Sequence, residues 1–341
     1  MRRDLNPGPH DAVTDVGGLL VGQYGRTDGG WATGCSVVLV PDGAVGGVDV
    51  RGGGPGTRET DLLDPSNLVQ RVQGVCLSGG SAFGLASADG VLRWLAERGH
   101  GLAVSSVPGR VVPIVPAAVL FDLDLGDWEL RPDAEFGYRA CERATAERPE
   151  EGSVGAGTGA TAGTLKGGIG TASTVLADGT TVGALVAVNP VGEVIDPTTG
   201  LPWYDDAATR AALGLTDPDP AEARRTAPPR GRRPLNTVIG VVATDTELTK
   251  AECRRVATVS HDGIARAIRP AHSIFDGDAV FVLATGARPA VDAATRVVAV
   301  DELAQAAADV FARAVVRGVL TATGLAGRPA YRERYPSAVR D

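Results

Sequence analysis

The chain has 341 residues, 43% hydrophobic and 22% charged, which is typical of a folded globular protein with one large or two ordinary domains. Its net charge of −8 and its isoelectric point of about 5.1 give no electrostatic support to nucleic-acid binding. No uncharged apolar run of about 18 residues occurs, and no apolar segment follows Arg2 and Arg3. We therefore expect neither a membrane span nor a signal peptide.

Four cysteines lie far apart in the sequence and form no C-x-x-C pair: Cys35, Cys76, Cys141 and Cys253. This spacing indicates buried free thiols and not a disulfide framework or a zinc site. We predict a cytoplasmic protein with no metal and no cofactor.

The first elements are β-strands at 19–23, 34–40 and 48–50. The glycine-dense segment 51–61 then breaks all periodicity. Its charged side chains fit either the lining of a pocket or an ordinary surface loop.

A second glycine-rich turn contains Gly80 and Ser81 and leads into a helical pattern at 85–98. A turn of this kind before a helix is a general anion or oxyanion site, so both residues are candidates for substrate binding. A nucleophile elbow is excluded because Phe83 occupies the last glycine position of G-x-S-x-G. The Gly-Lys-Ser/Thr of a Walker A loop is absent as well.

A proline-interrupted apolar stretch at 111–123 precedes a predicted helix at 134–148, and residues 155–170 are then dense in Gly, Thr and Ala. This last segment is not a dinucleotide fingerprint, because no strand leads into it and no helix follows it. The segment contains one lysine, Lys166. It either places a positive charge at a site where the backbone packs closely, or it is an ordinary loop lysine.

The buried-type strand at 181–188 ends at Asn189. The side-chain amide of Asn189 could stabilise an oxyanion. An Asn-Pro turn is the more common use of such a residue.

Residues 217–236 form a Pro- and Arg-rich segment that we predict to be an exposed linker. The β-branched run 238–243 follows and predicts a strand buried on both faces. Thr237 stands at the junction. If the bond after Asn236 were cut, the new α-amine, with an ordinary pKa of about 7.7–8.0, could activate the Thr237 hydroxyl. The alternative is a simple loop-to-strand junction.

The next helix is predicted at 248–269, with Thr249 and Glu252 as its capping box. His261 and Asp262 lie within it. A His-Asp metallophosphohydrolase is excluded because the chain has only 4 histidines.

Asp276 and Asp278 lie in a turn before a strand at 279–286, and a final helix is predicted at 291–325. The other ligands of a calcium loop do not follow the two acids. The carboxylates could instead orient an ammonium group.

Together these stretches resemble the L-aminopeptidase/D-esterase (DmpA-type) peptidase family, which includes β-aminopeptidases and nylon hydrolase, the 6-aminohexanoate-oligomer endohydrolase. The resemblance covers residues 13–325. It is carried by R-G-G-G-P-G-T-R-E-T, L-S-G-G-S-A-F-G-L, V-P-A-A-V-L-F-D-L, G-A-G-T-G-A-T-A-G-T-L-K-G-G-I-G, V-A-V-N-P-V-G, N-T-V-I-G-V-V-A-T-D and D-G-D-A-V-F.

The resemblance implies an α/β fold, a four-layer α/β/β/α sandwich of the N-terminal-nucleophile type. It implies one autoprocessed domain over 1–341, cut into an α-chain (1–236) and a β-chain (237–341) that stay associated as a homo-oligomer of αβ pairs. The expected substrates are short peptides or aminohexanoate oligomers. Apart from the associated chains, the only expected binding partner is this small amide or peptide substrate. We expect no binding to nucleic acid or to a membrane.

By position, the resemblance makes Thr237 the nucleophile, formed by cutting after Asn236. Lys166, Asn189, Asp276 and Asp278 become the other catalytic residues.

The sequence departs from the family at Phe121, a substrate-binding position where nylon hydrolase and the aminopeptidases have a tyrosine. The lost hydroxyl removes an oxyanion donor or acid, a group typically worth about 3–4 kcal/mol. Two alternatives therefore stay open: an acyltransferase of the ornithine acetyltransferase type, and a non-catalytic uncut relative acting as a binding module.

Overall fold

The computed structural model describes residues 6–224, 235–289, 292 and 294–339. Its strands are β1 Leu20–Arg26, β2 Thr33–Val50, β3 Thr57–Arg58, β4 Arg71–Ser78, β5 Leu102–Ala103, β6 Val111–Val112, β7 Ala117–Val119, β8 Thr161–Ala162, β9 Leu165–Lys166, β10 Gly168–Val175, β11 Thr181–Asn189, β12 Thr237–Thr246 and β13 Ala279–Arg288. Its α-helices are α1 Ser87–Glu97, α2 Ala134–Glu142, α3 Ala207–Ala212, α4 Pro220–Ala223, α5 Lys250–Ala267, α6 Arg296–Leu320 and α7 Tyr331–Arg334.

The main sheet has the strand order β10-β11-β12-β13-β2-β4-β7-β3, and β1 also pairs with β2. The long strand β2 joins its two halves. Residues 33–39 of β2 pair with β1, 35–39 also pair with β4, and 45–50 pair with β13 on the other half. Strand β12 pairs with β13 in parallel and with β11 in antiparallel orientation, so it is an interior strand.

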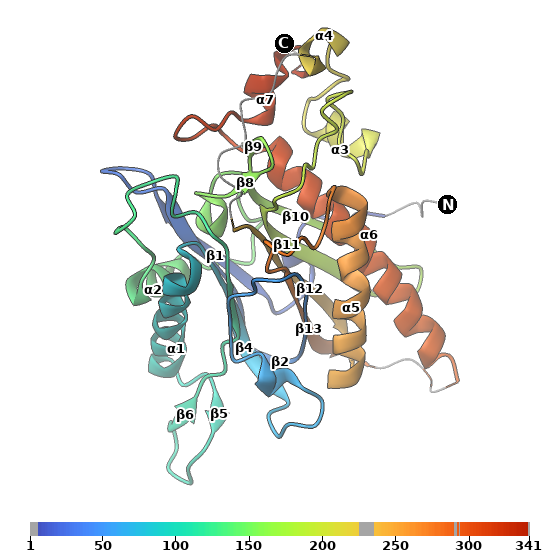
Figure 1. Ribbon diagram of the computed structural model, residues 1–341. Helices are drawn as coiled ribbons and strands as arrows, with labels where there is room; N and C mark the ends of the chain where they lie inside the picture. The colour runs from blue at the N-terminus through green and yellow to red at the C-terminus, as the bar shows by residue number, and fades with distance from the viewer. Residues whose placement is uncertain (1–5, 225–234, 290–291, 293, 340–341) are drawn as a thin grey trace.

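The structure has four layers, with helices α1 and α2 on one side of the strands and helices α5 and α6 on the other (Figure 1). Three apolar clusters lie between these layers. One cluster lies between α1, α2 and the half-sheet of β1, β2 and β4. A second contains side chains from both half-sheets, and a third lies between α5, α6 and the strands β10 to β13. Alternating side chains of β12 face different clusters: Val238 and Val242 face the helices, whereas Ile239 and Val241 face the opposite half-sheet. The predicted α/β/β/α sandwich is confirmed.

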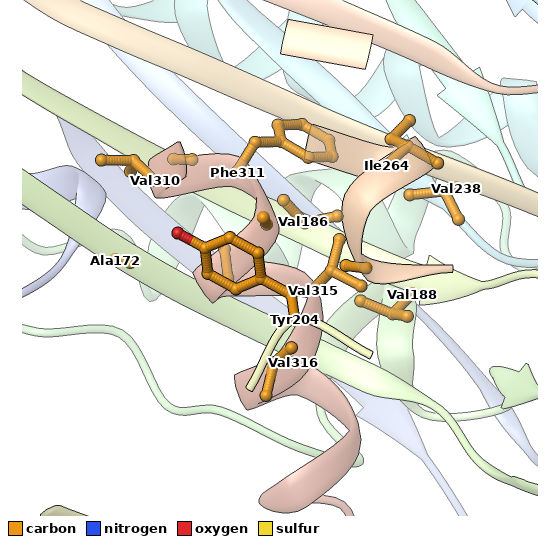
Figure 2. Packing of buried hydrophobic residues seen from close by; sticks show 14 of the residues in the cluster. Ala172, Val186, Val188, Tyr204, Val238, Ile264, Val310, Phe311, Val315 and Val316 are labelled. Carbon is orange, nitrogen blue, oxygen red and sulfur yellow. The ribbon is translucent and has the colours of Figure 1, made fainter. Parts of the chain in front are cut away.

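Helix α6 packs closely on β10 and β11. Figure 2 shows Phe311 and Val315 of this helix among Val186 and Val188 of β11. The backbones approach so closely that a Cβ on Gly170 would collide with the carbonyl oxygen of Ala314. Glycine at position 170 therefore sets the distance between helix and sheet.

Several predicted elements are confirmed, and others change. The capping box of Thr249 and Glu252 is present at the start of α5. The predicted strands at 34–40 and 48–50 are one strand, β2, in which the pairing with β4 shifts register between Leu39 and Ala44 without ending the strand. The helix predicted at 134–148 ends at Glu142. Strands β4 and β10 were not predicted.

The prediction of an exposed linker at 217–236 holds in part for the described residues, because Asp217, Asp219, Pro220, Ala221, Arg224 and Leu235 are exposed. Pro218 and Ala223 are buried, and Pro220–Ala223 forms α4. Asn236 at the other end is only 3% exposed, whereas Leu235 is exposed. The segment of Pro218 and Ala223 contacts the C-terminal segment, for example through the bond from Arg334 Nη1 to the Glu222 carbonyl oxygen. Residues 225–234 lie outside the described residues.

All four cysteines are buried and free, as predicted. Within the described ranges, no helix has both the length and the apolar character needed to cross a bilayer.

Replacement of Gly170 by alanine tests the close contact of α6 with β10. We expect Gly170→Ala to lower the free energy of unfolding by about 1–3 kcal/mol, because the added methyl group forces helix and sheet apart. Gly17→Ala is the control, since no atom lies within 4 Å of an added Cβ there. Urea unfolding measures both; equal stability of the two variants would contradict this packing.

Candidate active site

The candidate site is built around the junction of Asn236 and Thr237, at the first residue of β12. Thr237 pairs with Asn189, the last residue of β11. Asn236 and Thr237 are 3% and 4% exposed. The predicted nucleophile therefore begins an interior strand, and the preceding Asn236 forms a parallel bridge with Asp276.

Hydrogen bonds hold Asn236 on its backbone and its side chain. The backbone N–H of Asn236 donates to the Phe275 carbonyl oxygen (3.0 Å), and the side-chain Nδ2 donates to the Pro190 carbonyl oxygen (2.9 Å). The Asn236 carbonyl oxygen accepts from Gly277 N–H (3.1 Å) and from the hydroxyl of Thr237. The hydroxyl of residue 237 thus contacts the carbonyl group that precedes it.

Asp278 contacts the same strand. Its Oδ1 accepts from Val238 N–H (2.8 Å), and its Oδ2 lies 2.6 Å from His272 Nδ1. The side chain of Asp278 is only 2% exposed. Sequence reasoning did not single out His272.

Asp276 lies two residues earlier in the same turn. Its carboxylate accepts from the N–H groups of Val191 and Ser273, both at 3.0 Å. Burial raises the pKa of Asp276 to about 6, and the neighbouring Asp278 adds to this rise.

The glycine-dense loop after β2 supports this turn. Gly53 and Gly54 donate their N–H groups to the Asp276 carbonyl oxygen at 2.8 and 3.0 Å, and Arg51 N–H donates to the Asp278 carbonyl oxygen at 2.7 Å. Thr57 lines a separate cleft of about 330 Å³, whose lining includes none of the candidate site residues. The sequence suggested either a pocket lining or a surface loop. Neither interpretation included the hydrogen bonds that the first residues of the loop donate to the turn of Asp276 and Asp278.

Asn189 joins three segments. Its Oδ1 accepts from Thr161 N–H (2.7 Å), and its Nδ2 donates to the Phe121 carbonyl oxygen (3.0 Å). Because Asn189 also pairs with Thr237, these contacts bring the segments of Thr161 and Phe121 to the start of β12.

Lys166 is fully buried, and it pairs with Thr161 in the short β8–β9 ladder. Its ammonium group donates to the carbonyl oxygens of Gly157 (2.9 Å) and Gly167 (3.0 Å). Burial lowers the pKa of Lys166 to about 7, and Asp122 partly opposes this effect. Lys166 can therefore gain or lose a proton near neutral pH.

Asp122 is a buried carboxylate that sequence reasoning missed. It is 4% exposed and accepts from Gly80 N–H at 2.7 Å. Burial raises its pKa to about 6. A Cβ on Gly79 or Gly159 would collide with its side chain, so both glycines make room for it. The signal in the sequence was an acid inside the apolar run 111–123.

The three predicted substrate-binding residues lie around Asp122. Gly80 bonds to it directly, and Ser81 N–H donates to the Leu120 carbonyl oxygen (2.9 Å). The ring of Phe121 packs edge-on against Trp128, with ring centroids 6.3 Å apart. The contacts thus connect every predicted site residue to one region at the start of β12.

No group of three or more His, Cys, Asp or Glu side chains in the described segments could hold a metal ion.

Solved structures share this fold. The L-aminopeptidase D-Ala-esterase/amidase of Ochrobactrum anthropi, described as a variant of the Ntn-hydrolase fold, has a TM-score of 0.74 at 22% identity. The alignment covers 98% of this chain and 92% of that one. A β-aminopeptidase of a Burkholderia species has a TM-score of 0.71 at 24% identity, covering 98% and 94% of the two chains. The fold is therefore that of an Ntn-type hydrolase.

Residues 11–332 match peptidase family S58, and the chain belongs to this family. It is 52% identical to the uncharacterized aminopeptidase Rv1333 of Mycobacterium tuberculosis, covering 96% of this chain and 99% of the relative. It is 29% identical to the 6-aminohexanoate-oligomer endohydrolase of Paenarthrobacter ureafaciens, covering 80% and 74%. The resemblance drawn from the motifs is confirmed, and the chain is an amide hydrolase.

The buried ammonium group of Lys166 makes stability depend on pH. Because its pKa is about 7 in the folded chain and 10.5 ordinarily, the unfolded state binds more protons between these values. The free energy of unfolding should therefore rise with pH from about 7 to 10.5, by up to about 1.4 kcal/mol per pH unit.

The substitution Lys166→Met removes this contribution. The two chains compared are Thr237→Ala and the double variant Lys166→Met/Thr237→Ala. Neither can be processed at Thr237, so processing does not affect the comparison. We expect the chain that keeps Lys166 to gain stability relative to the Lys166→Met chain as pH rises in urea unfolding. A constant difference over this range would contradict the lowered pKa.

Proposed function

We propose that the chain cuts itself between Asn236 and Thr237 and then hydrolyses amide bonds of short peptides with Thr237 as its N-terminal nucleophile. One observation carries the proposal: the Thr237 hydroxyl donates to the Asn236 carbonyl oxygen, which also accepts Gly277 N–H. The attacking group thus lies against its target, and a backbone donor already contacts the atom that would become the oxyanion.

Burial supports self-cleavage over cutting by another protease. Asn236 and Thr237 are 3% and 4% exposed, so a second enzyme could not reach the bond without unfolding β12. The attacking hydroxyl, by contrast, belongs to the residue itself.

The first step is an N-to-O acyl shift. Thr237 Oγ attacks the Asn236 carbonyl carbon, the peptide C–N bond breaks, and the hydroxyl proton ends on the released nitrogen. Water then hydrolyses the Asn236 ester. The products are the carboxylate of Asn236 and a free α-amine on Thr237.

In turnover, the α-amine takes the proton of Thr237 Oγ, directly or through one water, as Oγ attacks the substrate carbonyl carbon. The substrate amine leaves with a proton, and water hydrolyses the acyl-enzyme. Asn189 has a second Nδ2 hydrogen beyond the one given to Phe121, and this hydrogen can serve the oxyanion.

Three charged residues act on the α-amine and the oxyanion in this mechanism: Lys166, Asp276 and Asp278. A protonated Lys166 would add to oxyanion stabilisation and lower the pKa of the α-amine by repulsion. Asp276 and Asp278 are buried and already bound to backbone N–H groups. This favours their balancing the Thr237 ammonium over their binding the amino end of a substrate.

Phe121 cannot supply the hydroxyl group of the family tyrosine. The backbone donor at Gly277 and the Asn189 amide are the groups available in its place. An uncut, inactive chain would favour the binding-module alternative.

After the cut, the two chains would stay together. Strands β12 and β13 of the β-chain lie between β11 and β2 of the α-chain. Arg317 on α6 also pairs with Glu151 of the α-chain at 2.6 Å. We further propose a homo-oligomer of αβ pairs in the cytoplasm, a compartment that fits the free buried cysteines.

Three variants test the nucleophile. Thr237→Ala should remain one uncut chain and lose about 10⁴-fold or more of its amidase rate, because no hydroxyl remains. Thr237→Ser should still cut and hydrolyse. Thr246→Ala, at the other end of β12, is the control and should behave as the wild type. Intact mass and peptide hydrolysis are measured; cutting in Thr237→Ala would contradict the scheme.

Substrate choice is tested with short peptides bearing free or acetylated amino ends, and with 6-aminohexanoate oligomers. An aminopeptidase releases single N-terminal residues, and acetylation abolishes the reaction because the free amine is part of recognition. Mass spectrometry identifies the products. Internal cleavage of the oligomers, unaffected by acetylation, would instead identify an endo-acting amidase.

A further inference from the structure

His272 makes a contact that the proposed mechanism does not yet use. Its Nδ1 lies 2.6 Å from Asp278 Oδ2. Because an ionised carboxylate only accepts hydrogen bonds, the proton of this contact belongs to Nδ1. The imidazole therefore donates to the aspartate whose other oxygen contacts the nucleophile strand.

The two oxygens of Asp278 are held from opposite sides. Oδ1 accepts from Val238 N–H at 2.8 Å, directly after Thr237, and Oδ2 accepts from His272. The Asp278 side chain is 2% exposed, so water does not readily replace either donor. Removal of one donor would allow the carboxylate to rotate about its last bond.

The backbone also indicates a specific need for this side chain. His272 has φ 51°, in the left-handed region that most residues avoid. The conformation places the imidazole against Asp278, and the ring packs edge-on against His261 with centroids 5.0 Å apart. His261 Nε2 is in turn 3.1 Å from the Asp49 carbonyl oxygen, so helix α5 supports the ring of His272 from behind.

We propose that His272 is a positioning residue that fixes Asp278 in the orientation required for chemistry at Thr237. The proposal rests on the proposed function. It extends the site by one residue: helix α5 holds His261, His261 packs on His272, His272 orients Asp278, and Asp278 holds the start of β12.

The test uses substitutions that separate the donor from the backbone. His272→Asn keeps an N–H donor near the Nδ1 position and tolerates the left-handed region. His272→Gly also accepts this backbone but has no donor. Ala326→Gly, at another left-handed residue (φ 48°), is the matched control for the added backbone freedom.

We expect His272→Gly to lower kcat by about tenfold or more, as for other residues that orient a site ligand, with KM nearly unchanged. His272→Asn should recover most of this loss, and Ala326→Gly should keep the wild-type rate. In the presence of Asp278→Asn, His272→Gly should cause little further loss, because its action passes through the carboxylate. The half-time of self-cleavage is followed in the same samples.

Two results would overturn the proposal while leaving the proposed function intact. One is a wild-type kcat in His272→Gly. The other is equal loss in His272→Asn and His272→Gly, which would show that the hydrogen bond is not what matters. An uncut and inactive wild-type chain would overturn the proposed function, and this proposal with it.

Discussion

The account depends on one constraint: the peptide bond between Asn236 and Thr237 is buried where an interior strand begins. Backbone pairing with Asn189 and the bonds from Asn236 to Phe275 and Gly277 hold this bond rigidly. Such rigidity is what a reaction between adjacent groups requires, because near-attack geometry replaces the entropy cost of bringing reactants together. The surrounding sandwich supplies it, since β12 cannot move without disturbing β11 and β13.

The same burial controls the charges of the site. Lys166, Asp122 and Asp276 are at most 4% exposed, and their pKa values move toward neutrality, to about 7, 6 and 6. Burying ionised groups is costly, and hydrogen bonds with backbone groups offset part of that cost: N–H groups donate to the two aspartates, and carbonyl oxygens accept from Lys166. The site thus keeps groups that can change protonation near neutral pH in a place that excludes water.

The sequence allowed a large part of the fold to be predicted, because local patterns carry it. The β-branched run 238–243 gave β12, and Thr249 with Glu252 gave the start of α5. The single long β2 was missed because its continuity depends on partners distant in sequence. The burial of Pro218 and Ala223 was missed because it depends on the C-terminal segment, which contacts this part of the chain from far away in the sequence.

The site shows the same division. Lys166, Asn189 and the two aspartates were selected through family resemblance, since each has a common structural alternative when considered alone. Asp122 and His272 were missed because only the fold brings them to Gly80 and Asp278. A buried carboxylate or a left-handed histidine has no distinct local pattern.

The most direct test of the central claim is the intact mass of the purified wild-type protein under denaturing conditions. The account predicts two fragments, one ending at Asn236 and the other beginning at Thr237. A single full-length species that persists for days would contradict it, because the hydroxyl and carbonyl groups already in contact would then not react.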